Sequence, residues 1–193
     1  MSDNWDDYAE EWDTDCDAKL YSEKAYETLE HEIDIQGLYI MDFGCGTGLL
    51  TEKMASSARS IVALDLSTKM IDVLNSKNLP NVITISGSLT SQVINENPAF
   101  INKFNVIVAS SVFSFIPEYV TTLKLLKSLL SPGGLLLHWD WLPPKPDSNF
   151  GLSELNVKSS LIKAGFNQIT TTPFSLTSSK GTMSVIMGVA KNA

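Results

Sequence analysis

The chain has 193 residues, of which 22 are acidic and 14 are Lys or Arg, so its formal net charge is −8. This length predicts a single domain, and the acidic balance argues against a nucleic-acid partner, whose phosphates are bound by Lys and Arg. No apolar run approaches the length of a membrane span, and Met1 is not followed by the basic and apolar parts of a secretory signal, so we expect no membrane partner.

Cysteine usage indicates a reducing compartment. Cys16 and Cys45 are the only two cysteines, and Cys45 lies inside a glycine-rich loop, where a disulfide would disturb the backbone. We therefore expect a cytoplasmic protein with free thiols. Nothing in the sequence requires an obligatory protein partner.

The N-terminal segment combines acidic and aromatic residues. Residues 1–17 contain eight acidic residues and no Lys or Arg, while Trp5, Tyr8 and Trp12 recur at the spacing of one helix face. We expect residues 1–31 to form a helical segment that either packs onto the domain or closes over its site as a lid. Because the acids repel one another, the rings are expected to provide the docking energy through apolar burial.

A glycine-rich loop follows the first predicted strand. The strand covers residues 38–43 and contains Asp42; glycines then alternate at positions 44, 46 and 48, and a helix begins at Leu49. Such a loop turns sharply and presents backbone amides and a helix N-terminus to a ligand. The alternative is a purely structural glycine turn. A dinucleotide fingerprint is disfavoured because its third glycine would stand where Leu49 is.

The second predicted strand, residues 59–64, leads into Asp65. This is about the spacing of a carboxylate that accepts hydrogen bonds from the two hydroxyls of a ribose. The alternative is that Asp65 only complements a helix dipole. Ser67 is expected to cap a helix that runs through Lys77.

The remaining elements define the fold class. Strands over residues 82–86, 104–109 and 134–139 alternate with helices, and strands over 167–172 and 183–190 form a hairpin with no helix between them. Pro132 and Gly133 are expected to stop the last core helix. We predict an α/β fold of one domain, residues 1–193: a Rossmann-like three-layer sandwich over residues 38–190, with a mostly parallel seven-stranded sheet and an antiparallel C-terminal edge hairpin.

The Asp42-x-Gly-x-Gly-x-Gly loop resembles motif I of the class I S-adenosylmethionine-dependent methyltransferases. The S-S-V-F-S-F-I-P-E stretch after residue 109 and the P-G-G junction before residue 135 are similar to segments of the same family. The resemblance implies S-adenosylmethionine as cofactor, with the loop along its methionine part and Asp65 on its ribose. Relatives often have Gly-Asp after the third strand; here Ser88 replaces the Asp, and its hydroxyl can accept the hydrogen bond of the adenine amino group. The cofactor-binding residues so implied are Asp42, Gly44, Cys45, Gly46, Gly48, Asp65, Leu66, Met70, Gly87, Ser88, Leu89, Ala109 and Ser110.

His138 is the candidate general base. It ends an apolar strand, and Asp140 falls on the same face two residues later, where it could orient the imidazole. Trp139 and Trp141 point to the other face and could wall a pocket. The alternative is a histidine that is only hydrogen-bonded at a strand end. Because the other histidine, His31, has no ligand-type neighbours either, we expect no metal.

The resemblance predicts an enzyme that transfers a methyl group to a small-molecule acceptor. A protein methyltransferase is the alternative enzyme, since an acidic surface attracts basic partners. A cofactor-binding domain without catalysis is the alternative outside enzymology, and a dehydrogenase is the least favoured.

Overall fold

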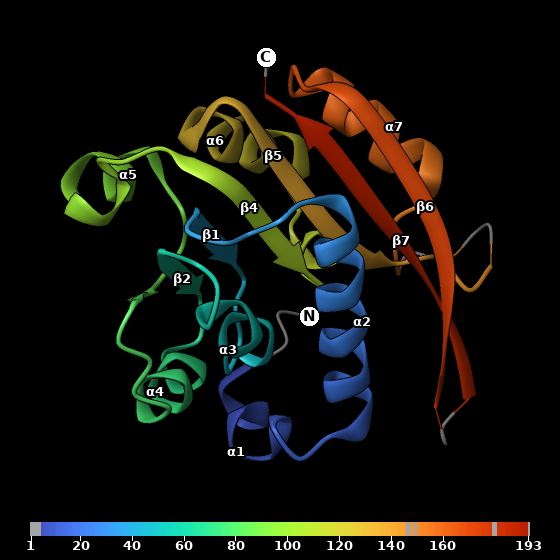
Figure 1. Cartoon of the computed structure of the whole chain (residues 1–193). Coiled ribbons are helices and arrows are strands. Elements are labelled where there is room, and N and C mark those ends of the chain that lie inside the picture. Colours follow the sequence, from blue (N-terminus) through green and yellow to red (C-terminus); the bar gives the residue numbers. More distant parts are fainter. Residues whose placement is uncertain (1–4, 146–147, 149, 179–180, 193) are drawn as a thin grey trace.

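A computed structural model describes residues 5–145, 148, 150–178 and 181–192. Its centre is a seven-stranded sheet in the order β3-β2-β1-β4-β5-β7-β6 (Figure 1). The strands β3, β2, β1, β4 and β5 pair in parallel, whereas β7 pairs antiparallel with both β5 and β6. The strands are β1 Tyr39–Phe43, β2 Ser60–Asp65, β3 Val82–Ser86, β4 Phe104–Ser110, β5 Leu130–Trp141, β6 Asn167–Ser178 and β7 Gly181–Lys191. The predicted Rossmann-like fold with an antiparallel edge hairpin is confirmed.

Helices cover both faces of the sheet, because the strands are apolar on both sides. One hydrophobic cluster joins α2 and α3 to the sheet, and a second joins α6 and α7 to the opposite face. Figure 1 shows α2 and α3 in front of the strands. The helical elements are η1 Trp5–Tyr8, α1 Ala9–Trp12, α2 Cys16–Glu32, α3 Leu49–Ala55, α4 Thr68–Ser76, α5 Ser91–Glu96, η2 Pro98–Phe100, η3 Phe113–Phe115, α6 Tyr119–Leu129 and α7 Glu154–Lys163.

Strand alternation decides which side chains face which helices. In β1, Met41 and Phe43 enter the cluster with α6 and α7, while Ile40 enters the cluster with α2 and α3. Asp42 shares the face of Ile40, since side chains two residues apart point the same way. The parallel strands β1, β2 and β4 end at one edge of the sheet, which is where α/β sheets bind ligands. Within the described ranges, no helix is both long and apolar enough to cross a membrane.

Element boundaries differ from the sequence prediction in two regions, around the start of β5 and in the C-terminal hairpin. The helix α6 ends at Leu129, and β5 already begins at Leu130, so Pro132 and Gly133 lie inside an irregular start of the strand. Its register against β4 shifts there, which accommodates the proline. The hairpin strands are also longer than predicted, because their polar, alternating ends pair with each other beyond the core.

The N-terminal segment divides into two parts with different environments. The long helix α2 belongs to the core, where Tyr21, Ala25 and Leu29 pack on the sheet. Trp5, Tyr8 and Trp12 lie not on one continuous helix but on the short turn η1 and the single-turn helix α1. The three rings nevertheless gather, with Trp5 centred 6.0 Å from both Tyr8 and Trp12.

Trp139 links α2 to the sheet. Its side chain is fully buried, and its Nε1 donates a hydrogen bond of 2.9 Å to Thr28 Oγ1. Trp139→Phe removes this bond and leaves unfilled volume, so it should lower the free energy of unfolding by about 1–3 kcal/mol. Urea unfolding measures the change. Leu155→Ala, at a side chain that is 78% exposed on α7, is the control and should cost less than about 0.5 kcal/mol. Equal loss in both variants would contradict this account of the link.

Candidate active site

The glycine loop between β1 and α3 has the backbone conformation that its residues allow. Gly44, Gly46 and Gly48 all have positive φ, at 73°, 53° and 83°. A Cβ at Gly44 would lie 2.3 Å from Val112 Cγ2, whereas a Cβ at Gly46 would have Trp12 Nε1 as its nearest neighbour at 3.9 Å. The first glycine therefore permits close packing, and Gly46 faces open space that a ligand can enter.

That open space is a cavity of about 700 Å³ at the carboxyl ends of β1, β2 and β4. The volume falls within the roughly 300–1,000 Å³ typical of small-molecule sites. Of the residues predicted to bind cofactor, those that line it are Asp42, Gly44, Cys45, Gly46, Asp65, Leu66, Met70, Gly87, Ser88, Leu89 and Ser110. Residues from the carboxyl ends of β1, β2, β3 and β4 are thus brought together around one cavity.

Gly48 and Ala109 are the two predicted residues that do not line the cavity. Ala109 is fully buried within β4. Gly48 precedes α3, and a Cβ there would meet Leu74 Cδ1 at 2.3 Å, so its role is to let α4 pack against the loop. Both residues lie behind the cavity wall.

Asp65 holds the glycine loop from the neighbouring strand. Its Oδ2 accepts a hydrogen bond of 2.8 Å from the Gly46 amide, and its Oδ1 accepts one of 2.9 Å from the Ser67 amide. Burial raises the pKa of this carboxyl, and the amide hydrogen bonds oppose that rise. A carboxylate oxygen has more than one lone pair, so both oxygens can accept a further donor from the cavity.

Asp42 carries a buried oxygen that has no described partner. Its Oδ2 accepts a hydrogen bond of 2.6 Å from Thr51 Oγ1, but its Oδ1 has no hydrogen-bond partner among the described residues. Burial, with a smaller contribution from the Asp65 charge, raises the pKa of Asp42 to about 7. Since buried polar atoms are normally paired, the unpartnered Oδ1 marks a place for a donor from a ligand.

The helix α2 contributes side chains that the sequence prediction missed. Tyr21 Oη and Ser22 Oγ are buried and unpartnered within the described chain, and both residues line the cavity. Burial raises the pKa of Tyr21, with the Asp140 charge as a further cause, so the phenol stays protonated and can donate. The recurrence of Tyr21, Ala25 and Leu29 at every fourth position was the available signal that Tyr21 faces inward.

Aromatic side chains close the other side of the cavity. Trp5 contacts Phe115 edge to face, with centroids 5.0 Å apart, and Tyr21 packs on Trp141 at 4.6 Å. All four line the cavity, together with Trp12. Trp141 thus walls the pocket as predicted, whereas Trp139 is turned into the core.

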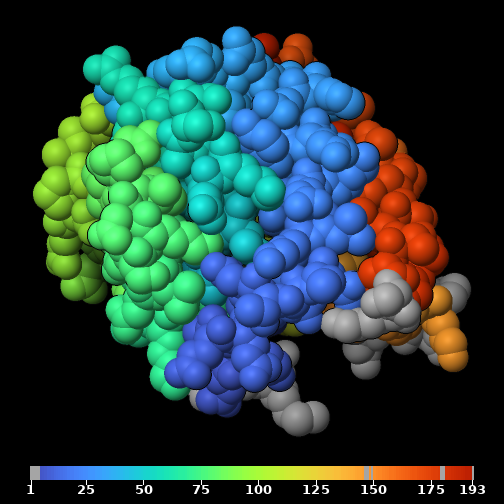
Figure 2. All heavy atoms as spheres, turned by 60° about the horizontal axis from the view of Figure 1, so that its bottom comes forward, coloured from blue at the N-terminus to red at the C-terminus, as the bar shows by residue number. Residues whose placement is uncertain are grey.

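Residues 5–15, called the N-terminal cover below, lie over this cavity. Figure 2 shows this segment in dark blue at the surface. Asp6 accepts a hydrogen bond from Ser67, and Asp13 accepts one from Thr47 of the glycine loop. Lys77 Nζ forms salt bridges with Asp13 and Glu52, at distances of 2.8 Å and 3.1 Å. The expectation that only the rings would dock this segment is therefore wrong, because two of its acids bind the domain directly.

His138 and Asp140 form the predicted pair but lie behind the cavity. His138 Nδ1 and Asp140 Oδ2 are 3.0 Å apart, and neither residue has exposed surface or lines the cavity. Asp140 Oδ1 accepts hydrogen bonds from the amide and the hydroxyl of Ser114, at 2.9 Å and 3.0 Å. Through Ser114 the pair holds η3, whose Phe115 does reach the cavity.

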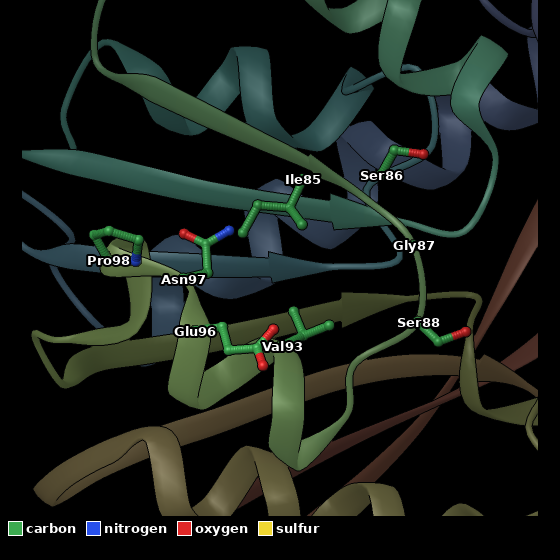
Figure 3. Close-up of a pocket in the computed structure, with 8 residues that line it drawn as sticks. All are labelled: Ile85, Ser86, Gly87, Ser88, Val93, Glu96, Asn97 and Pro98. Atoms are coloured by element: carbon green, nitrogen blue, oxygen red, sulfur yellow. The ribbon is translucent and has the colours of Figure 1, made fainter.

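A second, shallower groove of about 420 Å³ lies between the end of β3 and α5 (Figure 3). It shares Gly87 and Ser88 with the main cavity, and Ser88 points away from Glu96 and Asn97 on the far side of the groove. The two spaces therefore meet at the Gly87–Ser88 backbone. Among the described residues, no cluster of His, Cys, Asp or Glu has the geometry to hold a metal ion.

Comparisons with known proteins agree with this geometry. The sequence model of the family described as "Methyltransferase domain" matches residues 40–134. The malonyl-[acyl-carrier protein] O-methyltransferase of Halalkalibacterium halodurans is 39% identical over 102 residues, which cover 51% of this chain and 37% of that protein. The ubiquinone biosynthesis O-methyltransferase of Actinobacillus pleuropneumoniae is 29% identical over 103 residues, covering 52% and 44%. The chain thus spans less than half the length of these curated relatives.

Solved structures share the fold. A SAM-dependent methyltransferase from Aquifex aeolicus superposes with a TM-score of 0.68 at 20% identity, covering 91% of this chain and 92% of that one. The DhpI–SAH complex superposes with a TM-score of 0.67 at 15% identity, covering 98% and 93%.

The raised pKa of Asp42 predicts a pH dependence of stability. Because the folded pKa of about 7 lies above the ordinary value of 3.8, the folded state binds the proton more tightly than the unfolded state does. The free energy of unfolding of the ligand-free protein should fall as pH rises between these values, by up to about 1.4 kcal/mol per pH unit. Asp42→Asn should lack this component. Urea unfolding of both proteins across the range gives the difference, and parallel curves would refute the assignment.

Proposed function

We propose that this chain, which belongs to the class I S-adenosylmethionine-dependent methyltransferase family, transfers a methyl group from that cofactor to a small-molecule acceptor. The observation that carries the proposal is the cavity at the strand ends, where the open face of Gly46, the Asp65 carboxylate and the unpartnered Asp42 oxygen converge. Two of the relatives are named as O-methyltransferases, of malonyl-acyl-carrier protein and in ubiquinone biosynthesis, and these names also favour methyl transfer.

The donors and acceptors of the cavity fit the parts of this cofactor. Asp65 would accept the ribose hydroxyls, and Asp42 Oδ1 would accept the α-ammonium of the methionine part. The hydroxyls of Tyr21 and Ser22 are neutral donors for the α-carboxylate. Leu66 and Met70 from one side and Gly87, Ser88 and Leu89 from the other would enclose the adenine.

When bound, the cofactor's sulfonium supplies a methyl group that is already activated for displacement. The chain's own contribution is to hold the acceptor in line and exclude water, an effect worth up to about 7–11 kcal/mol in well-oriented systems. The aromatic wall of Trp5, Phe115 and Trp141 serves this purpose. We assign His138 and Asp140 a positioning role in the same wall, because they act on it through Ser114.

We propose further that the N-terminal cover acts as a lid. Asp13 binds Thr47 of the glycine loop, and Asp6 binds Ser67, which lies two residues after Asp65 in the chain. Both anchors therefore connect the cover to cofactor-binding segments, while Trp5 reaches Phe115 on the acceptor side. A covered cavity favours a small acceptor over the side chain of a protein.

One prediction of this proposal concerns the choice of cofactor. Isothermal titration calorimetry should show binding of S-adenosylhomocysteine and no comparable binding of NAD. Gly46→Leu should abolish the binding, because its side chain fills the open space. Asp65→Ala should weaken it by at least about tenfold, the loss expected for charge-assisted hydrogen bonds. Asp72→Asn, on the exposed face of α4, is the matched control. Tighter binding of NAD would overturn the proposed function.

Another prediction concerns the N-terminal cover as a lid. Deleting residues 1–13 should leave the fold intact but weaken S-adenosylhomocysteine binding, since the deletion removes Trp5, Trp12 and both acidic anchors. Asp13→Ala should reproduce part of the loss, and Glu10→Gln, at an exposed position of the cover, should not. Normal binding and turnover by the deletion variant would show that residues 1–13 have no part in the site.

A further inference from the structure

We infer that the methyl acceptor is an apolar, ring-bearing molecule that carries no negative charge, and that a positive charge on it is favoured. The inference rests on the proposed function, because it concerns the part of the cavity that the cofactor would leave for the acceptor. It is carried by the charges and the aromatic faces of that part.

The cavity is acidic. Among the described residues that line it there are four aspartates, at positions 15, 17, 42 and 65, and no Lys, Arg or His. An anion entering such a cavity would lose its hydration without gaining a cationic side chain as partner. Acceptors that bear a carboxylate or a phosphate are therefore disfavoured.

The proposed cofactor contacts involve only two of these four aspartates. It carries a sulfonium and an α-ammonium against a single α-carboxylate, and Asp42 and Asp65 are the aspartates placed for it. Asp15 and Asp17 lie instead at the start of α2, where Asp15 Oδ1 caps the helix by accepting from the Asp17 and Ala18 amides, at 2.6 Å and 3.1 Å. Both residues also line the cavity.

The N-terminal cover, which lies over the cavity, is also mostly acidic. The N-terminal cover carries Asp6, Asp7, Glu10, Glu11 and Asp13, and Lys69 lies near Asp6. Lys77, which reaches the cover, is bound to Asp13 and Glu52. A surface of one sign attracts oppositely charged ligands and repels like-charged ones, so a cationic acceptor approaches most readily.

The body of the acceptor follows from the aromatic wall. Trp5, Trp12, Tyr21, Phe115 and Trp141 all line the cavity. Such rings stack on a planar apolar body, and their faces attract a cation within about 6 Å of the ring centre. Stacking fits a planar apolar ring of any charge, whereas the attraction to the ring faces favours an amine over an anion.

A series of naphthyl compounds that differ in charge tests the inference. Naphthylethylamine, naphthylethanol and naphthylacetate are titrated into the full chain saturated with S-adenosylhomocysteine, and quenching of tryptophan fluorescence reports binding. The amine should bind most tightly, the alcohol next, and the acetate at least tenfold more weakly than the amine. Binding of the acetate as tight as that of the amine would overturn the inference.

Variants assign the effect to the cavity. Asp17→Asn removes one of the two charges without touching the cap residue Asp15, so it should reduce the advantage of the amine over the alcohol severalfold. Glu27→Gln, an exposed carboxylate on the same helix that pairs with Lys24, should leave the series unchanged. Thermal unfolding checks that both variants fold. An unchanged preference in folded Asp17→Asn would refute the role of this charge.

The two proposals fail differently in this experiment. A chain that does not bind S-adenosylhomocysteine at all contradicts the proposed function. A chain that binds it and then prefers the acetate contradicts only the inferred acceptor class.

Discussion

The hydrogen bond from the Gly46 amide to Asp65 joins the ends of two neighbouring strands, and the geometry of the site depends on it. Parallel strands bring β1 and β2 to the same edge, but only a glycine with positive φ turns the loop so that its amide meets the carboxylate. The amides of Gly44 and Cys45 complete the link by donating to Leu64 O. The carboxyl end of β2 therefore holds the glycine loop in place and also presents the carboxylate that is proposed to bind ribose.

This arrangement concentrates negative charge in a buried place. Burial raises the pKa of Asp42 to about 7, and the nearby Asp65 charge adds to this rise. Such a pair is unfavourable in the free protein, and a ligand with positive groups relieves it. The N-terminal cover adds Asp6, which is bound to Ser67, and Asp13, which is bound to Thr47 and Lys77. We therefore expect the site to favour ligands that carry positive groups.

The sequence allowed the sheet, the glycine loop and the strand-end carboxylates to be predicted, because periodicity and spacing determine them locally. The same alternation predicted the contact between His138 and Asp140 correctly. It did not predict that β7 would cover His138, which Gly188 permits because a Cβ there would lie 2.4 Å from Nε2. Nor did it place Tyr21 and Ser22 in the cavity, since the position of α2 follows from tertiary packing. The acidic anchors of the cover were missed for the same reason.

We propose that Asp65 binds the ribose and Asp42 the α-ammonium of one cofactor, on either side of the glycine loop. A crystal structure of the chain with S-adenosylhomocysteine tests it most directly. We expect the ribose hydroxyls within hydrogen-bond distance of the Asp65 carboxylate, the α-ammonium on Asp42 Oδ1, and the amino-acid part of the ligand passing over Gly46. A ligand bound outside this cavity, or with its adenine end at Asp42, would refute these roles of Asp42 and Asp65.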